Sequence, residues 1–421
     1  MHTLQRLSLI TLMISSTLCA DNSTGLSPSM LPFSVLEQLD NGTEIRNGGF
    51  GSAMTAHPNH PDRFYALTDR GPNAKYTGPQ GKGKKFPMPA YTPKISEYRL
   101  NKEGSVEMIR EIQLKDSQGN RITGLPNPAG MGSTGEVPYD NNGKVLKTDP
   151  FGLDSEGLVA LKDGSFWVSD EYGPHIVHYN AAGVELERIN PFGTGTGGRK
   201  LPAVLANRRA NRGMEGLAIT PDEKTLVGIM QSTLFNPSKS AISNKNLTRI
   251  LTFDIATGET HQYLYRQEAN SLSNSEIAAI SNTEFLVIER DGGFYGSNAQ
   301  YKRLYKIDLR TASDVSGDFS DPQGLRINER TLEQNSWAEL ASANIQPVTK
   351  TLVADVLNDI QYPHDKLEGI WIRNSTTVGL LNDDDFAVSA NGGEVIQKRL
   401  PADDSVDSNR LYMIQLDSKL Y

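Results

Sequence analysis

Acidic residues recur in this chain at the start of short predicted hairpins. In four places a glutamate precedes the residues that would begin a strand: Ser155-Glu156-Gly157-Leu158, Met214-Glu215-Gly216-Leu217, Ser275-Glu276-Ile277-Ala278 and Leu367-Glu368-Gly369-Ile370. After 13 to 16 residues, the length of two strands and a tight turn, each copy reaches a second polar group: Asp170-Glu171, Gln231, Glu289-Arg290-Asp291 and Asp383-Asp384. The start of the first strand and the end of the second lie at the same end of an antiparallel hairpin. Each glutamate is therefore predicted to lie beside its own second polar group.

If the hairpins surround a common axis, these carboxylates converge on one mouth. Crowded carboxylates repel one another and become partly protonated unless a cation neutralises them. Ca²⁺ suits such a group, because it takes about six to eight oxygen ligands. The predicted metal ligands are Asp69, Glu156, Asp170, Glu171, Glu215, Glu289, Glu368 and Asp383. The alternative is that each glutamate only accepts backbone amide bonds where one hairpin meets the next.

Basic residues accompany the acids, and these are Arg70, Arg212, Arg290 and Lys366. Cations beside a carboxylate ring suit recognition of a small anionic substrate, although each could instead form an ion pair with its neighbour. The predicted catalytic residues are Glu156, Glu215 and Asp170, around a metal-activated water, together with His175 for acid–base work.

Periodic hairpins predict an all-β fold, a single β-propeller of about six or seven four-stranded blades with short helical insertions. Five blades follow from the pattern, including a degenerate first copy at residues 48–68, and the remainder from the chain length. Helical segments are predicted within 201–211 and 329–343. The long Gly- and Pro-containing loops at 72–94 and 116–152 are predicted to lie at the mouth.

Composition limits the function classes. The chain has 421 residues, of which 37% are hydrophobic and 22% charged, and the formal net charge of −8 argues against a nucleic-acid partner. Residues 193–198 satisfy G-x-G-x-x-G but lack the strand and helix of a dinucleotide site, so no organic cofactor is expected. No P-loop, H-E-x-x-H or G-x-S-x-G motif occurs.

The N-terminus is typical of a secretion signal. Arg6 precedes an apolar run at residues 7–18, which is too short to span a membrane, and a cleavage site follows at Ala20. We therefore predict a signal peptide at 1–20 and a secreted or periplasmic propeller domain at 21–421, without stable membrane insertion. Cys19 is the only cysteine, and Leu18 disfavours its lipidation, which stays the alternative.

Four motifs in combination resemble the phytase-like family, described as "esterase-like activity of phytase". They are Asp69-Arg70-Gly71-Pro72-Asn73, Asp154-Ser155-Glu156-Gly157-Leu158, Ser169-Asp170-Glu171-Tyr172-Gly173-Pro174 and Asn211-Arg212-Gly213-Met214-Glu215-Gly216-Leu217. The resemblance runs from about Gly48 to Leu416. It implies a secreted or periplasmic propeller that hydrolyses a phosphoester or another ester.

Three functions are compatible with these features. The first is a Ca²⁺-dependent hydrolase that cleaves a phosphoester or ester of a small anionic substrate at the mouth of the channel. The second is a lactone or carboxyl-ester hydrolase, and the third is a non-enzymatic binding protein with a structural metal. The sequence carries no signal for an oligomeric state.

Overall fold

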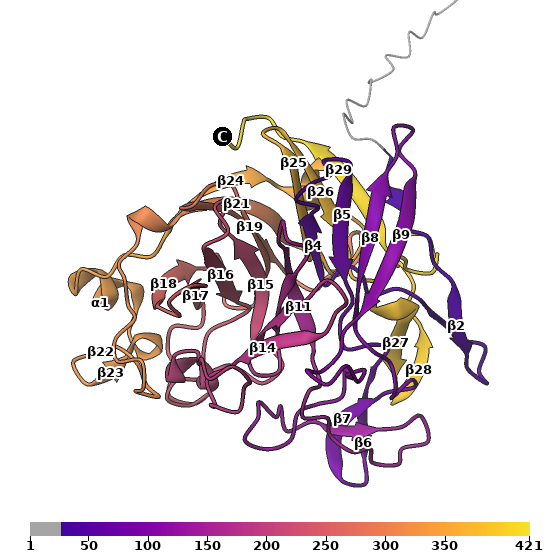
Figure 1. Ribbon diagram of the computed structural model, residues 1–421, viewed down its shortest axis with the longest axis horizontal. Helices are drawn as coiled ribbons and strands as arrows, with labels where there is room; N and C mark the ends of the chain where they lie inside the picture. Colours follow the sequence, from indigo (N-terminus) through magenta and orange to yellow (C-terminus); the bar gives the residue numbers. More distant parts are fainter. Residues whose placement is uncertain (1–26) are drawn as a thin grey trace, which may run out of the picture.

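Five antiparallel sheets of four strands each dominate the computed structural model, which describes residues 27–421 (Figure 1). We number these sheets as blades in chain order. Blade 1 contains β4 (Ala53–Ala56), β5 (Arg63–Leu67), β8 (Lys94–Leu100) and β9 (Val106–Gln113). Blade 2 contains β11 (Ser155–Ala160), β12 (Phe166–Asp170), β13 (Ile176–Tyr179) and β14 (Glu185–Ile189). Blade 3 contains β15 (Met214–Ile219), β16 (Thr225–Met230), β17 (Leu247–Asp254) and β18 (Thr260–Arg266).

The last two blades have less regular connections. Blade 4 contains β19 (Ser273–Ala279), β20 (Glu284–Arg290), β21 (Lys302–Asp308) and β24 (Thr349–Ala354). Blade 5 contains β25 (Gly369–Asn374), β26 (Thr377–Leu381), β29 (Arg410–Gln415) and β1 (Ser29–Met30). Since β1 pairs with β29, strands from both ends of the described chain complete this blade.

The first strands of the five blades form a closed ring. Neighbours contact one another in the order β4, β11, β15, β19, β25 and back to β4, which is the arrangement of a β-propeller. The predicted propeller is thus confirmed, but the predicted six or seven blades are not met by residues 27–421, which contain five four-stranded sheets. The chain length that suggested further blades is used in long insertions.

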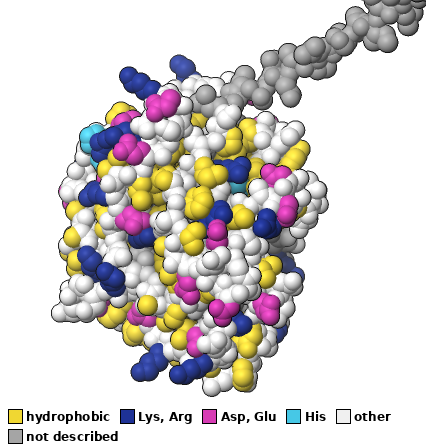
Figure 2. Space-filling model, turned by 90° about the vertical axis from the view of Figure 1, so that its right-hand side faces the viewer, with side chains coloured by type: hydrophobic (Ala, Val, Ile, Leu, Met, Phe, Trp, Pro, Cys, Tyr) yellow, Lys and Arg dark blue, Asp and Glu magenta, His cyan; other side chains and the backbone are white. Residues whose placement is uncertain are grey.

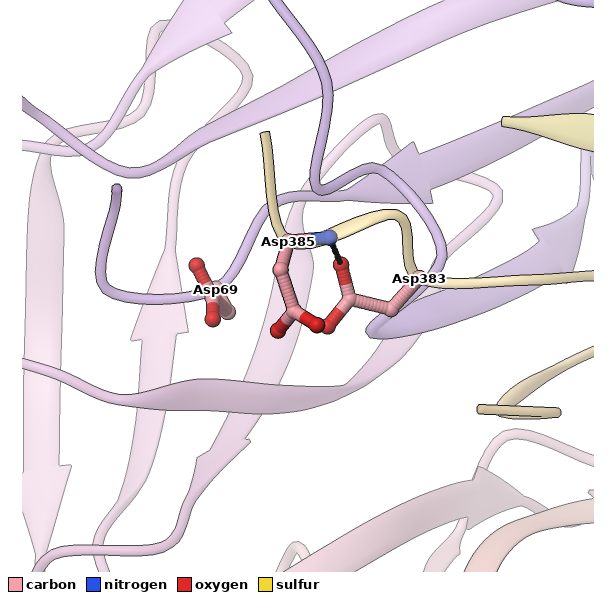
Figure 3. A group of neighbouring side chains, drawn as sticks. All are labelled: Asp69, Asp383 and Asp385. Atoms are coloured by element: carbon pink, nitrogen blue, oxygen red, sulfur yellow. Dashed lines mark hydrogen bonds between the residues drawn. The ribbon is translucent and has the colours of Figure 1, made fainter. Parts of the chain in front are cut away.

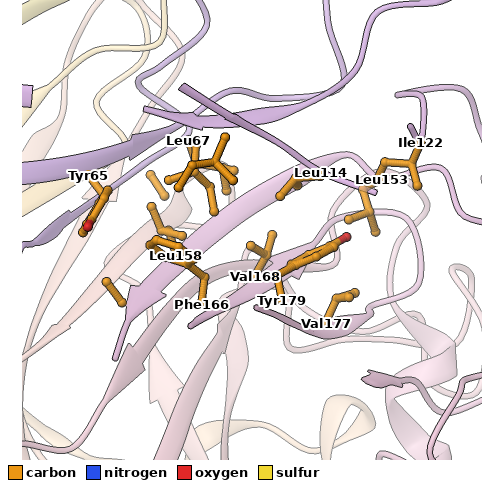
Figure 4. Packing of buried hydrophobic residues seen from close by; sticks show 14 residues of the cluster. Tyr65, Leu67, Leu114, Ile122, Leu153, Leu158, Phe166, Val168, Val177 and Tyr179 are labelled. Atoms are coloured by element: carbon orange, nitrogen blue, oxygen red, sulfur yellow. The ribbon is translucent and has the colours of Figure 1, made fainter. Parts of the chain in front are cut away.

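The core lies between the blades. Alternate residues of a strand point to opposite faces of its sheet. In blade 2, Leu158 and Phe166 pack toward blade 1, as Figure 4 shows, whereas Val159 and Trp167 pack toward blade 3. Similar clusters fill the other three junctions of the ring. Burying one such side chain contributes roughly 1.5–3 kcal/mol, so these clusters fix the blades relative to one another.

A small sheet stands over one end of the ring. It consists of β6 (Ala74–Gly78), β7 (Gly81–Lys85) and β10 (Val137–Tyr139), and we call it the mouth sheet. The hairpin of β27 (Val388–Asn391) and β28 (Glu394–Gln397) contacts β6, and Figure 1 shows both beside the propeller. The predicted mouth loops at 72–94 and 116–152 therefore contain strands of their own. A further hairpin pairs β2 (Val35–Gln38) with β3 (Glu44–Arg46).

The longest insertion interrupts blade 4 between β21 and β24. It contains β22 (Arg326–Ile327), β23 (Arg330–Thr331) and α1 (Trp337–Ser342), and α2 (Val356–Asp359) follows the blade. The helix predicted over 329–343 is shorter than expected, because a capping box of Ser336 and Glu339 starts α1 only at Trp337. Leu332 and Leu340 pack against blade 3. The segment at 201–211 forms a 3₁₀ helix at Ala203–Asn207.

The surface carries both signs of charge. On the face shown in Figure 2, basic and acidic side chains are interspersed. Among residues 27–421, no helix combines the length and apolar character needed to cross a bilayer. The predicted signal peptide at 1–20 and Cys19 lie outside the described residues.

Candidate functional site

A charged cavity of about 490 Å³ lies where the mouth sheet meets the ends of the blades. Seven acidic and seven basic side chains line it. The acids are Asp69, Glu156, Glu171, Glu215, Asp365, Glu368 and Asp385, and the bases are Arg70, Lys75, Lys84, Arg212, Arg290, Lys366 and Lys398. Three of the repeated glutamates thus converge at one mouth, as predicted from hairpin geometry.

Local backbone geometry directs the side chains of Glu156 and Glu215 into the cavity. The pairing of β11 with β12 skips Glu156, and that of β15 with β16 skips Glu215, so each glutamate is the extra residue of a β-bulge. A glycine follows each one because the next inner strand is very close. A Cβ on Gly157 would lie 2.6 Å from the backbone nitrogen of Leu217.

The third copy of the pattern, at Glu276, is displaced by one residue. In β19 the register skips Ser275, so Ser275 occupies the place of Glu156 and Glu215. Glu276 lies one position further along, outside the cavity lining. Its carboxylate accepts backbone N–H bonds from Ile277 at 2.9 Å and Leu217 at 3.3 Å. Glu276 therefore links blades 3 and 4, which is the structural alternative considered for this motif.

Polar contacts hold the cavity glutamates in place. The Gln231 side chain donates to Glu171 at 2.8 Å and to Glu215 at 2.5 Å. Arg290 forms an ion pair with Glu368 and lies 3.8 Å from Glu215. Burial, together with the charge of Glu368, raises the pKa of Glu215 to about 7.

The negative charges of one group of carboxylates have few cations or hydrogen-bond donors beside them. Ligand oxygens of Asp154, Glu156 and Glu171 lie within 4.8 Å of one another. Asp154 is 1% exposed, and neither of its carboxylate oxygens has a hydrogen-bond partner among residues 27–421, although Arg70 Nη1 lies 3.1 Å from Oδ2. Burial and the charge of Glu215 raise the pKa of both Glu156 and Glu171 well above the usual range. This group favours a proton or a cation.

A second group is already neutralised by lysines. Asp69, Asp383 and Asp385 also lie within 4.8 Å, and Figure 3 shows the Asp385 backbone N–H donating to Asp383, at 2.8 Å. Lys366 forms an ion pair with Asp383. It also lies 2.8 Å from Asp385, and Lys398 lies 2.6 Å from Asp385. Against the effect of burial, these lysines hold the pKa of Asp385 below its usual range.

Two predicted residues of blade 2 lie behind the cavity. Asp170 accepts backbone N–H bonds from Gly173, His175 and Asp154 at 2.9–3.1 Å, so it shapes the loop that presents Glu171. Burial raises the pKa of Asp170 to about 6. The ring of His175 is buried against Asn127 and Asn190, and burial lowers its pKa well below the usual range. Neither side chain lines the cavity.

Glu289 also lies away from the cavity. It accepts hydrogen bonds from Tyr265 at 2.6 Å and Lys350 at 2.8 Å. Its neighbour Arg290 points into the cavity instead. Of the eight predicted metal ligands, Asp69, Glu156, Glu171, Glu215 and Glu368 line the cavity, whereas Asp170, Glu289 and Asp383 do not.

The four predicted substrate-binding cations all line the cavity, and the structure adds residues that the sequence reasoning missed. These are Lys84 of the mouth sheet, Lys398 after β28, Asp385, and Asp154 behind Arg70. Asp154 is the first residue of the motif Asp154-Ser155-Glu156-Gly157-Leu158, and Asp385 directly follows Asp383-Asp384, so both could have been found from the predicted motifs. Lys84 lies in the loop at 72–94 that was predicted at the mouth, whereas Lys398 belongs to an insertion without the repeated pattern, which left no signal for its position.

Similarity to known proteins was found at three levels. An "Uncharacterized secreted protein" of Arthroderma benhamiae is 28% identical over 266 residues, covering 51% of this chain and 51% of that protein. The chain thus spans about half the length of this relative. Among solved structures, a Lactobacillus plantarum protein matches at 10% identity with a TM-score of 0.34, covering 89% of this chain and 92% of that one. The periplasmic gluconolactonase of Pseudomonas aeruginosa matches at 11% identity with a TM-score of 0.30, covering 90% and 92%.

The family comparison covers most of the propeller. Its model, described as "Phytase-like: Esterase-like activity of phytase", matches residues 45–386, which include the motifs around Asp69, Glu156 and Glu215. The match extends over far more than half of the 421 residues. The chain belongs to this phytase-like family.

Proposed function

We propose that the protein is a hydrolase that cleaves a phosphoester or another ester of a small anionic substrate in this cavity, with a divalent cation as cofactor. The observation that carries the proposal is the buried group of Asp154, Glu156 and Glu171 beside a cavity rich in cations. Membership of the phytase-like family supports the reaction class.

The residues present fit a cation at this group. Both oxygens of Asp154 lack a hydrogen-bond partner within residues 27–421, and buried carboxylates of this kind are usually paired or bind metal. Asp154, Glu156 and Glu171 would hold the ion, and Ca²⁺ suits an all-oxygen donor set. The lysine-neutralised group at Asp69, Asp383 and Asp385 fits less well. A bound cation supplies polarisation of the ester oxygen and a more acidic water.

Glu215 is the best-placed group to move a proton. A carboxyl with a pKa near 7 can both accept and donate a proton at neutral pH, which suits a general acid or base. The Gln231 amide and Arg290, which both belong to the cavity wall, fix the orientation of the Glu215 side chain. Its second oxygen, Oε2, is buried and has no hydrogen-bond partner among residues 27–421.

The test is hydrolysis of a substrate panel with and without metal. Purified protein is treated with EDTA and then given Ca²⁺, and release of inorganic phosphate and p-nitrophenol from phosphoesters, lactones and carboxyl esters is measured. We expect Ca²⁺ to restore activity, and Glu215→Gln to lower kcat at least ~100-fold through loss of proton transfer. Glu276→Gln, on the neighbouring inner strand but outside the cavity, is the matched control and should stay active.

Other outcomes separate the remaining functions. Ester or lactone cleavage without phosphate release assigns a carboxyl-ester or lactone substrate. Inactivity on the whole panel, while Ca²⁺ still raises the melting temperature, would instead indicate a binding protein with a structural metal.

We also propose export of the protein, with removal of residues 1–20. The support is the apolar N-terminal run and the relative described as secreted. N-terminal sequencing of protein recovered outside the cytoplasm should begin at Asp21, and a retained Met1 would contradict this.

A further inference from the structure

The cations of the cavity differ in whether a carboxylate already neutralises them. Arg70 lies 3.1 Å from Asp154, Arg290 pairs with Glu368, and Lys366 pairs with Asp383 and Asp385. Lys398 is likewise surrounded by acids. The charges of these four side chains are thus already neutralised by carboxylates of the cavity wall.

Lys84 and Arg212 are different. Lys84 Nζ donates to the neutral Asn73 side chain at 2.9 Å, and Arg212 Nη1 donates to the Ser273 hydroxyl at 3.0 Å. Neither forms an ion pair with a carboxylate of residues 27–421, although both line the cavity. Lys75 also lacks such a pair but is exposed at the rim, where water screens its charge.

The surroundings of Lys84 destabilise the charged form of its side chain. It is partly buried on β7, and burial together with the nearby Arg70 lowers its pKa. An anion beside Lys84 would remove that penalty. Arg212 supplies a planar fork of donors, and the combination of an ammonium and a guanidinium suits a phosphate or carboxylate group.

The charge of the lining supports an anionic ligand. Seven acids and seven bases balance formally, and Lys84 and Arg212 are the bases that line the cavity, are not exposed at its rim and have no carboxylate partner among residues 27–421. An anion would be attracted to these two charges.

We propose that Lys84 and Arg212 are the specificity-determining residues of the cavity and bind an anionic oxygen group, phosphate or carboxylate, of the substrate. That the bound anion is part of a substrate rests on the proposed hydrolase function, but binding of an anion at this site does not require catalysis. One of its two cations comes from the mouth sheet and the other from the segment preceding β15, so binding would engage both the insertion and a blade.

Calorimetric titration tests the site without catalysis. Inorganic phosphate and, separately, malonate are titrated into the EDTA-treated full-length protein. We expect at least one anion to bind, and Lys84→Gln and Arg212→Gln each to weaken it about tenfold or more, as for loss of a charged hydrogen bond. Preference for phosphate or malonate identifies the anionic group. Lys84→Arg should retain most of the affinity, which guards against a folding defect in Lys84→Gln.

Two controls are matched in type and position. Lys82→Gln changes an exposed lysine on the same strand, and Arg209→Gln changes an exposed arginine just before Arg212. Neither residue lines this cavity, so both variants should bind as the unmodified protein does. Failure of both anions to bind, or equal losses in the controls and the test variants, would overturn the proposal.

Activity measurements separate this proposal from the hydrolase proposal. Anion binding that depends on Lys84 and Arg212 in a protein that hydrolyses nothing supports the anion site and refutes the enzyme. Hydrolysis whose KM is unchanged in both variants, with unchanged anion binding, supports the enzyme and refutes the site.

Discussion

Asp154 belongs to the buried carboxylate group with Glu156 and Glu171, for which Arg70 is the one cation partner among residues 27–421. We predict that Ca²⁺ raises the melting temperature of the protein by several degrees, since a ligand at a hundredfold excess over its Kd stabilises the folded state by ~2.7 kcal/mol. Asp154→Asn should abolish this rise. Thermal denaturation with EDTA or Ca²⁺ measures both.

Asp385→Asn is the matched control, because Lys366 and Lys398 already neutralise Asp385. It should preserve the response to Ca²⁺. If Asp385→Asn removed the response and Asp154→Asn did not, the cation would belong to the other carboxylate group.

The cavity residues that the hairpins of blades 2 to 4 supply were predictable to within about one residue along the chain. Hairpin geometry correctly placed Glu156, Glu215 and Glu368 together. It could not decide between neighbours at the end of the second strand, because adjacent side chains point to opposite faces. Glu171 therefore faces the cavity and Asp170 does not, and Arg290 faces it while Glu289 does not. A bulge shifts the third copy, at Glu276, in the same way, and bulges leave no clear mark in a single sequence.

At the scale of the strand, the glycine after each cavity glutamate sets how closely the inner strands approach. We predict that Gly157→Ala lowers the free energy of unfolding by about 1–3 kcal/mol, because its Cβ would lie 2.6 Å from the backbone nitrogen of Leu217. Gly292→Ala is the control, since a Cβ there would meet no atom within 4 Å. Urea denaturation of both variants checks this, and equal stability would contradict it.

The strands explain why the fold was easier to predict than the number of blades. Repeated hairpins with alternating apolar residues specify the sheets and the faces that pack. The additional blades were inferred from the length of the chain, but that length is used in insertions such as the one that interrupts blade 4 between β21 and β24. A β-strand that completes an existing sheet and one that starts a new sheet have the same local pattern.

At the scale of the whole molecule, buried carboxyls make stability depend on pH. Burial, with the charge of Asp407, raises the pKa of Asp384 to about 8, and that of Glu215 is about 7. Between pH ~5 and ~8 the folded protein holds protons that the unfolded chain has released, so stability falls as pH rises. We predict this fall in urea denaturation of EDTA-treated protein. Asp384→Asn should make it shallower, and an unchanged slope would contradict the assignment.

Blade 5 has a consequence for biosynthesis. Blades 1 to 4 consist of strands that follow one another along the chain, so each can assemble as the polypeptide is extended. Blade 5 unites β1 with strands made some 340 residues later, and such distant pairings are slow to form. Until then, the apolar faces of blades 1 and 4 that later cover Trp371 and Ile370 stay exposed. A nascent or truncated chain that lacks β25 to β29 should therefore be a client of chaperones and proteases rather than a smaller, functional propeller.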